Sequence, residues 1–164
     1  MSKICFLGAG STVFAKNVIG DCLYVEALKD ATIALVDIDP ERLSDSEKMV
    51  LNLNKTLGGN LKVESYLAED AEKAFRGANY VINAIQVGGY EPCTVIDFEI
   101  PKKYGLRQTI GDTLGIGGIF RALRTIPVML KYCEIIEKVA PDALLLNYTN
   151  PMAMVTGAIL KATS

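Results

Sequence analysis

The stretch KICFLGAGSTVF, residues 3–14, decides how this chain folds. It opens with a short apolar run that is typical of a buried strand, and Gly8 and Gly10 follow this run at once. From Ser11 to about Leu28 the apolar residues return at helical spacing. The stretch therefore predicts a strand, a tight turn and a helix in direct succession.

The same alternation continues along the chain. Apolar runs predict further strands at 31–36, 61–67, 80–85 and 144–147. Helices are expected from Pro40 behind an Asp39 cap, at 70–75, at 119–140 with a kink at Pro127, and from Pro151 to the chain end, whereas 86–118 look less regular. Apolar strands that alternate with helices predict a parallel sheet covered on both faces. We therefore expect a doubly wound, Rossmann-like α/β fold, with residues 1–164 as one domain.

The composition excludes several classes of partner. The net charge is −2 and 22% of the residues are charged, so no basic footprint for nucleic acid or a membrane surface is expected. No apolar stretch approaches the ~18 residues of a membrane span, and the start resembles no secretory leader, which favours a cytoplasmic protein. The four cysteines form no Cys-x-x-Cys pair and are expected to be reduced, packed thiols. The chain has no histidine, the commonest general base near neutral pH.

The glycine turn fits a phosphate-binding turn of a dinucleotide site. Gly8 and Gly10 would allow a tight turn and close approach of a pyrophosphate, with Ser11 and Thr12 at the helix start. The third position of the motif is Val13, which weakens the match and changes how the helix fits the strand, so an ordinary strand-to-helix turn is the alternative.

A carboxylate at the end of the second expected strand strengthens this interpretation. Asp37 stands where a carboxylate accepts hydrogen bonds from the adenosine ribose and repels a 2′-phosphate, which favours NAD over NADP. Asp39 is the rival carboxylate, but its position fits the helix cap better. The first strand, turn, helix and strand therefore predict an NAD site.

Several stretches resemble one enzyme family. Polar and glycine-rich segments at 86–92, 108–113, 115–118 and 147–151 follow expected strand ends, where ligands bind in such sheets. The segments VINAIQVGGYEPCTVIDFE (81–99), IFRALR (119–124) and PDALLLNYTNPMAMVT (141–156) resemble glycoside hydrolase family 4, the NAD- and manganese-dependent glycosidases, and within it the melibiase-type α-galactosidases. The likeness runs from Ile4 to the end of the chain.

The resemblance implies an unusual route of hydrolysis. Family members oxidise the sugar at C3 with bound NAD, eliminate the anomeric substituent, add water and return the hydride, while a divalent metal stabilises the enolate. Most glycosidases instead use two carboxylates. An NAD-binding fold in a hydrolase would be explained in this way.

The resemblance also implies roles for particular residues. Asn150 matches a substrate-contacting asparagine, and capping of the following helix is its alternative role. Asp112 matches an acidic residue that raises the basicity of a catalytic tyrosine outside this chain. A solvated loop aspartate is the alternative for Asp112. The positions expected to contact the cofactor beyond the first turn are Gly88, Asn147 and Thr149; Gly117 and Gly118 match positions near the nicotinamide, with tight packing as their alternative.

One difference within the family narrows the substrate. Members that act on 6-phosphorylated sugars carry an arginine shortly after the Val-Gly-Gly turn, where it suits a phosphate. In this chain residues 90–94 contain no cation and include Glu91. A non-phosphorylated galactoside is therefore expected.

The family's remaining catalytic groups are expected beyond Ser164. The cysteine and histidine that bind Mn²⁺ and the catalytic tyrosine lie later in the family pattern, so no metal ligand is expected within this chain, and Cys133 is expected to pack in the core. We expect a chain truncated before the catalytic C-terminal region, inactive alone, with exposed apolar surface, and a homo-oligomer when full length. The alternatives are a malate- or lactate-type NAD-dependent dehydrogenase and a non-catalytic NAD-binding module.

Overall fold

The computed structural model describes residues 1–108 and 115–163. Contacts within the chain divide it into two compact units. The sheet unit consists of Met1–Ile85 and Ile135–Leu146, and the helical unit consists of Gln86–Glu134 and Asn147–Ser164. Each unit is described by itself.

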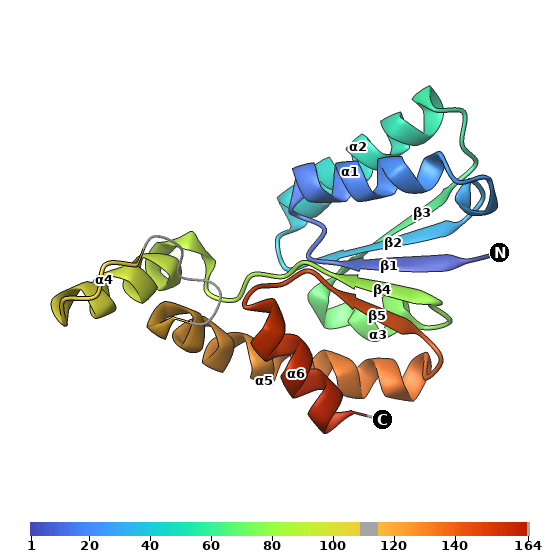
Figure 1. Cartoon of the computed structure of the whole chain (residues 1–164). Helices are drawn as coiled ribbons and strands as arrows, with labels where there is room; N and C mark the ends of the chain where they lie inside the picture. Colours follow the sequence, from blue (N-terminus) through green and yellow to red (C-terminus); the bar gives the residue numbers. More distant parts are fainter. Residues whose placement is uncertain (109–114, 164) are drawn as a thin grey trace. The chain divides into compact units, whose positions relative to one another are not determined.

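A five-stranded sheet is the framework of the sheet unit. Its strands are β1 (Lys3–Leu7), β2 (Thr32–Asp37), β3 (Lys62–Leu67), β4 (Tyr80–Asn83) and β5 (Leu144–Asn147), in the spatial order β3-β2-β1-β4-β5 (Figure 1). β1 pairs in parallel with β2 and with β4, and β2 pairs in parallel with β3. The order reverses at β1, whose carboxyl end carries the glycine turn, so the expected doubly wound, Rossmann-like fold is confirmed.

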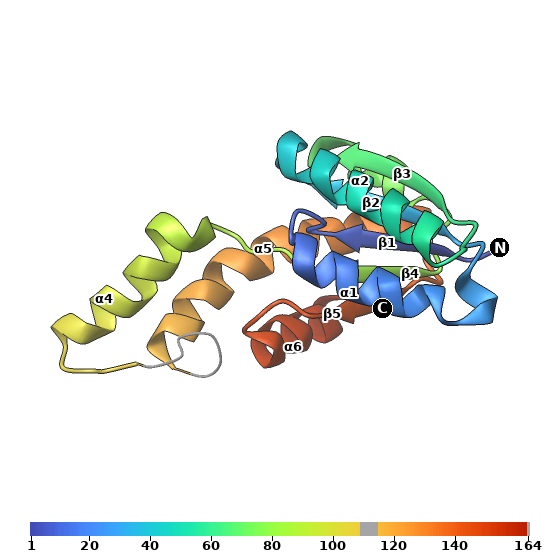
Figure 2. The same ribbon diagram turned by 90° about the horizontal axis from the view of Figure 1, so that it is seen from above.

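Helices cover both faces of this sheet. α1 (Thr12–Leu23) and α2 (Pro40–Thr56) lie on one face, as the view from above shows (Figure 2). α3 (Ala71–Phe75) lies on the opposite face (Figure 1). Short 3₁₀ turns at Glu26–Leu28 and Ala68–Asp70 precede β2 and α3. The helix expected to reach Leu28 therefore ends at Leu23, because the chain tightens into a separate turn before β2.

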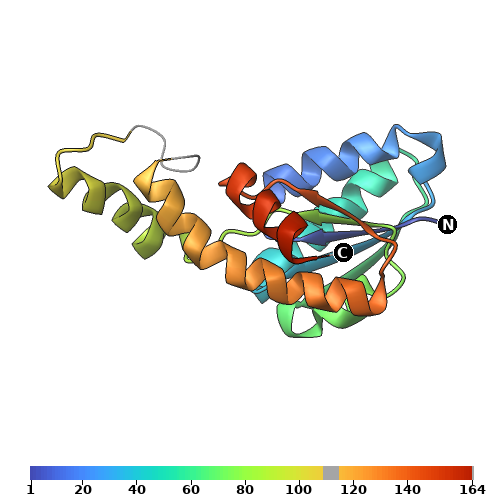
Figure 3. The ribbon, with the colours of Figure 1, turned by 60° about the horizontal axis from the view of Figure 1, so that its bottom comes forward.

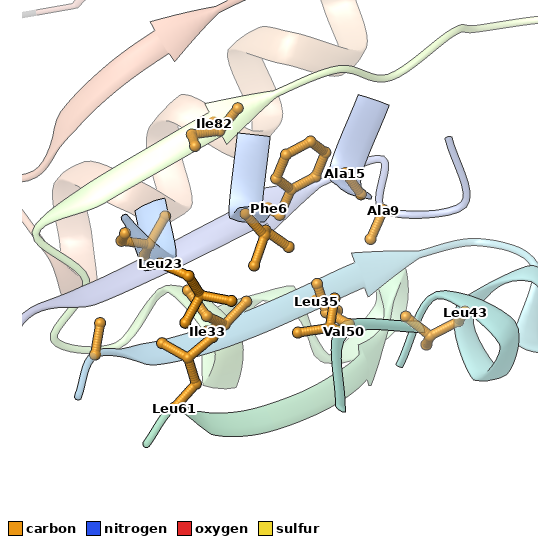
Figure 4. Packing of buried hydrophobic residues seen from close by; sticks show 13 residues of the cluster. Phe6, Ala9, Ala15, Leu23, Ile33, Leu35, Leu43, Val50, Leu61 and Ile82 are labelled. Atoms are coloured by element: carbon orange, nitrogen blue, oxygen red, sulfur yellow. The ribbon is translucent and has the colours of Figure 1, made fainter. Parts of the chain in front are cut away.

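The core of the sheet unit lies between the sheet and the pair α1 and α2. Phe6 of β1 and Ile33 and Leu35 of β2 belong to one buried cluster with Leu23 of α1 and Val50 of α2 (Figure 4). Consecutive residues of β1 and β2 are buried, so both faces of these strands are covered. This explains why their sequences are continuous apolar runs.

The start of α2 confirms the expected cap. Two backbone amides of the first turn donate to Asp39 Oδ1, that of Glu41 at 3.0 Å and that of Arg42 at 3.1 Å. Pro40 takes the first helical position, where its missing N–H costs nothing. This cap fixes where α2 begins, directly after β2.

The helical unit contains helices that the sequence patterns described only in part. It holds a π-type turn η3 (Gly89–Thr94), α4 (Val95–Lys103), the first part of α5 (Ile116–Val139) and α6 (Met152–Ala162). α4 runs beside the first part of α5 (Figure 3). None of the helices in the described part of the chain is both long and apolar enough to span a membrane.

Three expectations are corrected here. The irregular interpretation of 86–118 was wrong for Val95–Lys103, a helix whose buried face includes the charged Asp97, so its apolar pattern is interrupted. β4 ends at Asn83 rather than at 85, because Ile85 N turns back to donate to Asn83 Oδ1 at 3.3 Å. The last helix was expected to run to the chain end, but α6 ends at Ala162, where Thr163 turns to an extended conformation.

Candidate functional site

Gly8 sits where two backbone segments of the sheet unit pass very close together. Its φ is +91°, and a Cβ added there would lie 2.8 Å from backbone atoms of both Ala84 and Ile85. The amides of Gly8 and Ala9 both donate to the carbonyl of Val36, at 2.9 and 3.0 Å. Only glycine fits this conformation and this space, so the residue fixes the sharp turn at the carboxyl end of β1.

Gly10 makes room for a carboxylate. Its amide donates to Asp37 Oδ2 at 2.6 Å, and a Cβ at Gly10 would lie 2.7 Å from the same oxygen. Asp37 Oδ1 accepts from the amide of Asp39 at 3.0 Å. A carboxylate has about four lone-pair sites, so Asp37 retains acceptor capacity beyond these two contacts. The structure thus brings Gly8, Gly10 and Asp37 together as expected.

A buried serine holds the same turn from α2. Ser46 is fully buried, and its Oγ donates to the Ala9 carbonyl at 2.7 Å. Thr12 Oγ1 lies 3.5 Å from Ser46 Oγ and donates to the Gly10 carbonyl at 3.4 Å. Ser46 lies outside the glycine motif, but the sequence carries one signal for it, because it is a polar residue on the apolar face of α2 between Leu43 and Val50.

The start of α1 suits an anion. Ser11 is the N-cap and makes no side-chain capping bond, and the amides of the first helical residues, Thr12 and Val13, have no acceptor inside the helix by their position. Such an end carries partial positive charge. Val13 is 74% exposed, so its side chain does not lie between α1 and the sheet. The expectation that Val13 changes how α1 packs on the strand is therefore wrong. The buried Ala15 lies at that interface instead.

In the helical unit, the segment that joins β5 to α6 is held by Asn147. Its Oδ1 accepts from the Thr149 amide at 3.1 Å, and its Nδ2 donates to Thr156 Oγ1 on α6 at 2.9 Å. Thr149 is buried. The side-chain amide of Asn147 therefore fastens the segment to α6, a contact that the sequence did not reveal.

Asn150 is exposed, and its Oδ1 accepts from the Met152 amide at 3.3 Å, at the start of α6. This bond gives a partner to the first amide of α6, although the N-cap position itself is Pro151. An amide oxygen has a second lone pair and the Nδ2 group carries two protons, so this contact leaves room for a sugar hydroxyl. Its contact with substrate stays a prediction.

Beside the turn at Gly88 lies an ion pair between Arg124 and Asp97, which the sequence patterns did not indicate. Cys93 Sγ occupies the place that a Cβ on Gly88 would need. Arg124 Nε lies 3.4 Å from that place, and its Nη1 and Nη2 donate to the two oxygens of Asp97 at 2.8 and 2.6 Å. Asp97 is buried, and its carboxylate raises the pKa of the Arg124 guanidinium. The pair locks α4 to α5 beside the turn.

The other expected site residues give a mixed result. Gly117 and Gly118 are buried in the first turn of α5, where the Gly117 amide donates to Gln108 Oε1 at 2.9 Å, which fits the packing alternative. Asp112 lies outside the described residues. Within 1–108 and 115–163, no group of three His, Cys, Asp or Glu side chains could hold a metal ion.

The cysteines are all free thiols. Cys133 is 3% exposed, which confirms its packing role in the helical unit. Burial raises the pKa of the Cys5 thiol to about 12 and raises that of Cys22 as well. A raised pKa disfavours the thiolate, which is the nucleophilic form of cysteine, at both positions.

Comparisons with known proteins bear on this site. The Family 4 glycosyl hydrolase model matches residues 3–164. The chain is 60% identical over 164 residues to an alpha-galactosidase of Bacillus subtilis strain 168, covering 100% of this chain and 38% of that protein. It is 39% identical over 154 residues to an alpha-galacturonidase of Thermoanaerobacter italicus, covering 93% of this chain and 32% of that protein. The chain thus spans about a third of the length of these relatives.

Two solved structures show the same fold. The 6-phospho-beta glucosidase of Thermotoga maritima with manganese, NAD⁺ and glucose-6-phosphate matches with a TM-score of 0.74 and 29% identity, over 92% of this chain and 35% of that one. The malate dehydrogenase of Picrophilus torridus matches with a TM-score of 0.64 and 18% identity, over 99% of this chain and 42% of that one, a likeness of fold alone. With the family match extending over nearly all of its length, the chain belongs to the Family 4 glycosyl hydrolases.

Proposed function

We propose that this chain is the cofactor-binding part of an NAD- and manganese-dependent α-galactosidase that acts on non-phosphorylated galactosides. The observation that carries the proposal is the 60% identity to an alpha-galactosidase along all 164 residues. Identity to the alpha-galacturonidase is lower, at 39%, so a galactoside is favoured over a galacturonide. Likeness to the malate dehydrogenase is limited to the fold and does not support an ordinary dehydrogenase.

The sheet unit fits NAD. In this proposal Gly8, Gly10, Ser11 and Thr12 surround the pyrophosphate at the start of α1, and Asp37 accepts from the adenosine ribose hydroxyls while its charge repels a 2′-phosphate. Bound NAD would supply a reversible hydride acceptor for oxidation at C3 of the sugar, which makes the later elimination and addition of water possible. The cofactor contacts of Gly88, Asn147 and Thr149 rest on the family resemblance.

The helical unit supplies part of the sugar recognition. The exposed Asn150 amide donates to and accepts from sugar hydroxyls in this proposal. Arg124 is a cation beside the Gly88 turn, but its Nη1 and Nη2 both donate to the buried Asp97, so its charge is already paired with a carboxylate. The exposed Glu91 adds a negative charge to the same turn. These features support a substrate without a 6-phosphate.

The metal and the proton transfer are assigned outside the described residues. In this proposal, which follows the family resemblance, the ligands of Mn²⁺ lie in the part of the protein that follows this chain. Asp112 would raise the basicity of a tyrosine outside this chain, since a nearby negative charge disfavours tyrosinate. We therefore propose that the 164-residue chain alone does not cleave a galactoside.

The test measures hydrolysis of an aryl α-galactoside by the whole protein that contains this chain, dialysed and then supplied with NAD, Mn²⁺, both or neither. Cleavage is expected only with both, and with little cleavage of the matching galacturonide or 6-phosphogalactoside. Activity that is indifferent to NAD would overturn the proposal. NAD reduction by malate or lactate would instead support a dehydrogenase, and NAD binding without any turnover would support a non-catalytic module.

A further inference from the structure

One peptide group in the glycine turn is held from both sides. In a trans peptide the carbonyl and the following N–H point in opposite directions. The Ala9 carbonyl accepts from Ser46 Oγ of α2 at 2.7 Å, and the Gly10 amide donates to Asp37 Oδ2 of β2 at 2.6 Å. The orientation of the Ala9–Gly10 peptide plane is therefore set by two elements that lie later in the chain.

This arrangement decides which amides remain for an anion. The amides of Gly8 and Ala9 donate to the Val36 carbonyl, that of Gly10 donates to Asp37, and that of Ser11 donates to the Gly8 carbonyl at 3.2 Å. The amides of Thr12 and Val13, the first two residues of α1, have no acceptor inside the helix by their position and face the phosphate in this proposal. Their position follows from the peptide plane that Ser46 and Asp37 fix.

Ser46 also reaches the first residue of that helix. Its Oγ lies 3.5 Å from Thr12 Oγ1, and Thr12 Oγ1 donates to the Gly10 carbonyl at 3.4 Å. A buried hydroxyl on an otherwise apolar helix face is costly unless it is hydrogen-bonded, and the Ala9 carbonyl provides the partner. An alanine would pack between Leu43 and Val50 without that requirement.

We propose that Ser46 is a positioning residue for the pyrophosphate of the cofactor, because it fixes the Ala9–Gly10 peptide and the start of α1 from the neighbouring helix. The inference rests on the proposed cofactor role of this turn. Ser46 does not touch the cofactor; it sets the turn that does. Asp37, by contrast, both holds the turn and binds the adenosine ribose in this proposal. Replacing Ser46 should therefore affect binding of the pyrophosphate, whereas replacing Asp37 should also affect binding of the adenosine.

The experiment compares the affinities of the 164-residue chain for adenosine, ADP and NAD by NMR titration. Ser46→Ala removes one hydrogen bond and leaves the Ala9 carbonyl without this donor, so the affinities for ADP and NAD should fall by ~5-fold or more. The affinity for adenosine, which lacks the pyrophosphate, should not change. Ser44→Ala, a half-buried serine on the same helix, is the matched control and should change none of the three.

A second variant keeps the test decisive if Ser46→Ala folds poorly. Ser46→Cys fills the space and keeps a weak donor, so it should bind ADP with an affinity between those of the wild type and Ser46→Ala. Unchanged ADP affinity in the folded variants would overturn the inference, and so would an equal loss of adenosine and ADP, which a merely structural role predicts. A wild-type chain that binds none of the three ligands would overturn the cofactor proposal itself.

Discussion

Replacing Gly8 with alanine separates two reasons why the turn needs glycine. The residue has a φ of +91°, and a Cβ there would lie 2.8 Å from three backbone atoms of Ala84 and Ile85. Gly77, at the end of α3 in the same unit, has a φ of +71° with open space around its Cβ position. Gly77→Ala therefore has the conformational cost alone, whereas Gly8→Ala adds a clash with backbone.

The magnitudes follow from these geometries. A left-handed alanine costs ~1–2 kcal/mol, and part of this is offset because alanine restricts the unfolded chain. Gly77→Ala should thus lower the free energy of unfolding by about 1 kcal/mol. Forcing backbone apart adds ~1–3 kcal/mol at Gly8, so that variant should lose ~2–4 kcal/mol out of a typical total of ~5–15 kcal/mol.

The assay is urea denaturation of both variants followed by circular dichroism, with the free energy of unfolding extrapolated to water. Both glycines lie in the sheet unit, so the two variants perturb the same compact unit. A Gly8→Ala variant within about 0.5 kcal/mol of Gly77→Ala would refute the reasoning, since the steric contribution of Ala84 and Ile85 would then be absent.

Other contacts give further predictions. Arg124→Met leaves the buried Asp97 carboxylate without its partner and should cost ~3–5 kcal/mol of unfolding free energy in urea titrations, and a loss below ~1 kcal/mol would contradict a tight pair. Thr156→Val removes the nearer of two acceptors of Asn147 Nδ2, the other being the Thr149 carbonyl at 3.5 Å, and should lower the melting temperature by several degrees in thermal scans; an unchanged value would show that this bond is not stabilising. Because the Cys5 thiol has a native pKa of about 12 against 9.0 in the unfolded chain, the unfolded state binds fewer protons above pH 9, so stability should fall as the pH rises from 9 toward 12. Cys5→Ala should flatten that fall in denaturation curves measured across this range, and an identical slope would be evidence against the raised pKa.

The sheet and the helices around it could be read from the sequence because their signals are local. β1 and β2 are buried on both faces and therefore appear as continuous apolar runs. The cap of α2 is equally local, since Asp39 binds amides only two and three residues ahead. Glycine spacing and Asp37 likewise placed the turn and its carboxylate correctly.

The features that were missed depend on partners far along the chain. Asp97 interrupts the apolar face of α4, and its burial makes sense only with Arg124 on another helix. Ser46 interrupts the apolar face of α2 in the same way, with the Ala9 carbonyl as its partner. A polar residue at a buried position only weakens the apolar periodicity of its helix, so the pattern does not indicate a role for it. No spacing rule identifies a hydrogen-bond partner that lies about 30 residues away in the sequence.

The double hold on the Ala9–Gly10 peptide also has a consequence for the order of folding. Its two holding groups come 27 and 37 residues after the atoms they bind, so short-range interactions alone do not complete the turn. β2 and the first turns of α2 must dock beside β1 before the turn takes its final form, which requires closure of a loop of about that length. During synthesis, the turn near the amino terminus therefore becomes complete only after Ser46 has emerged and packed.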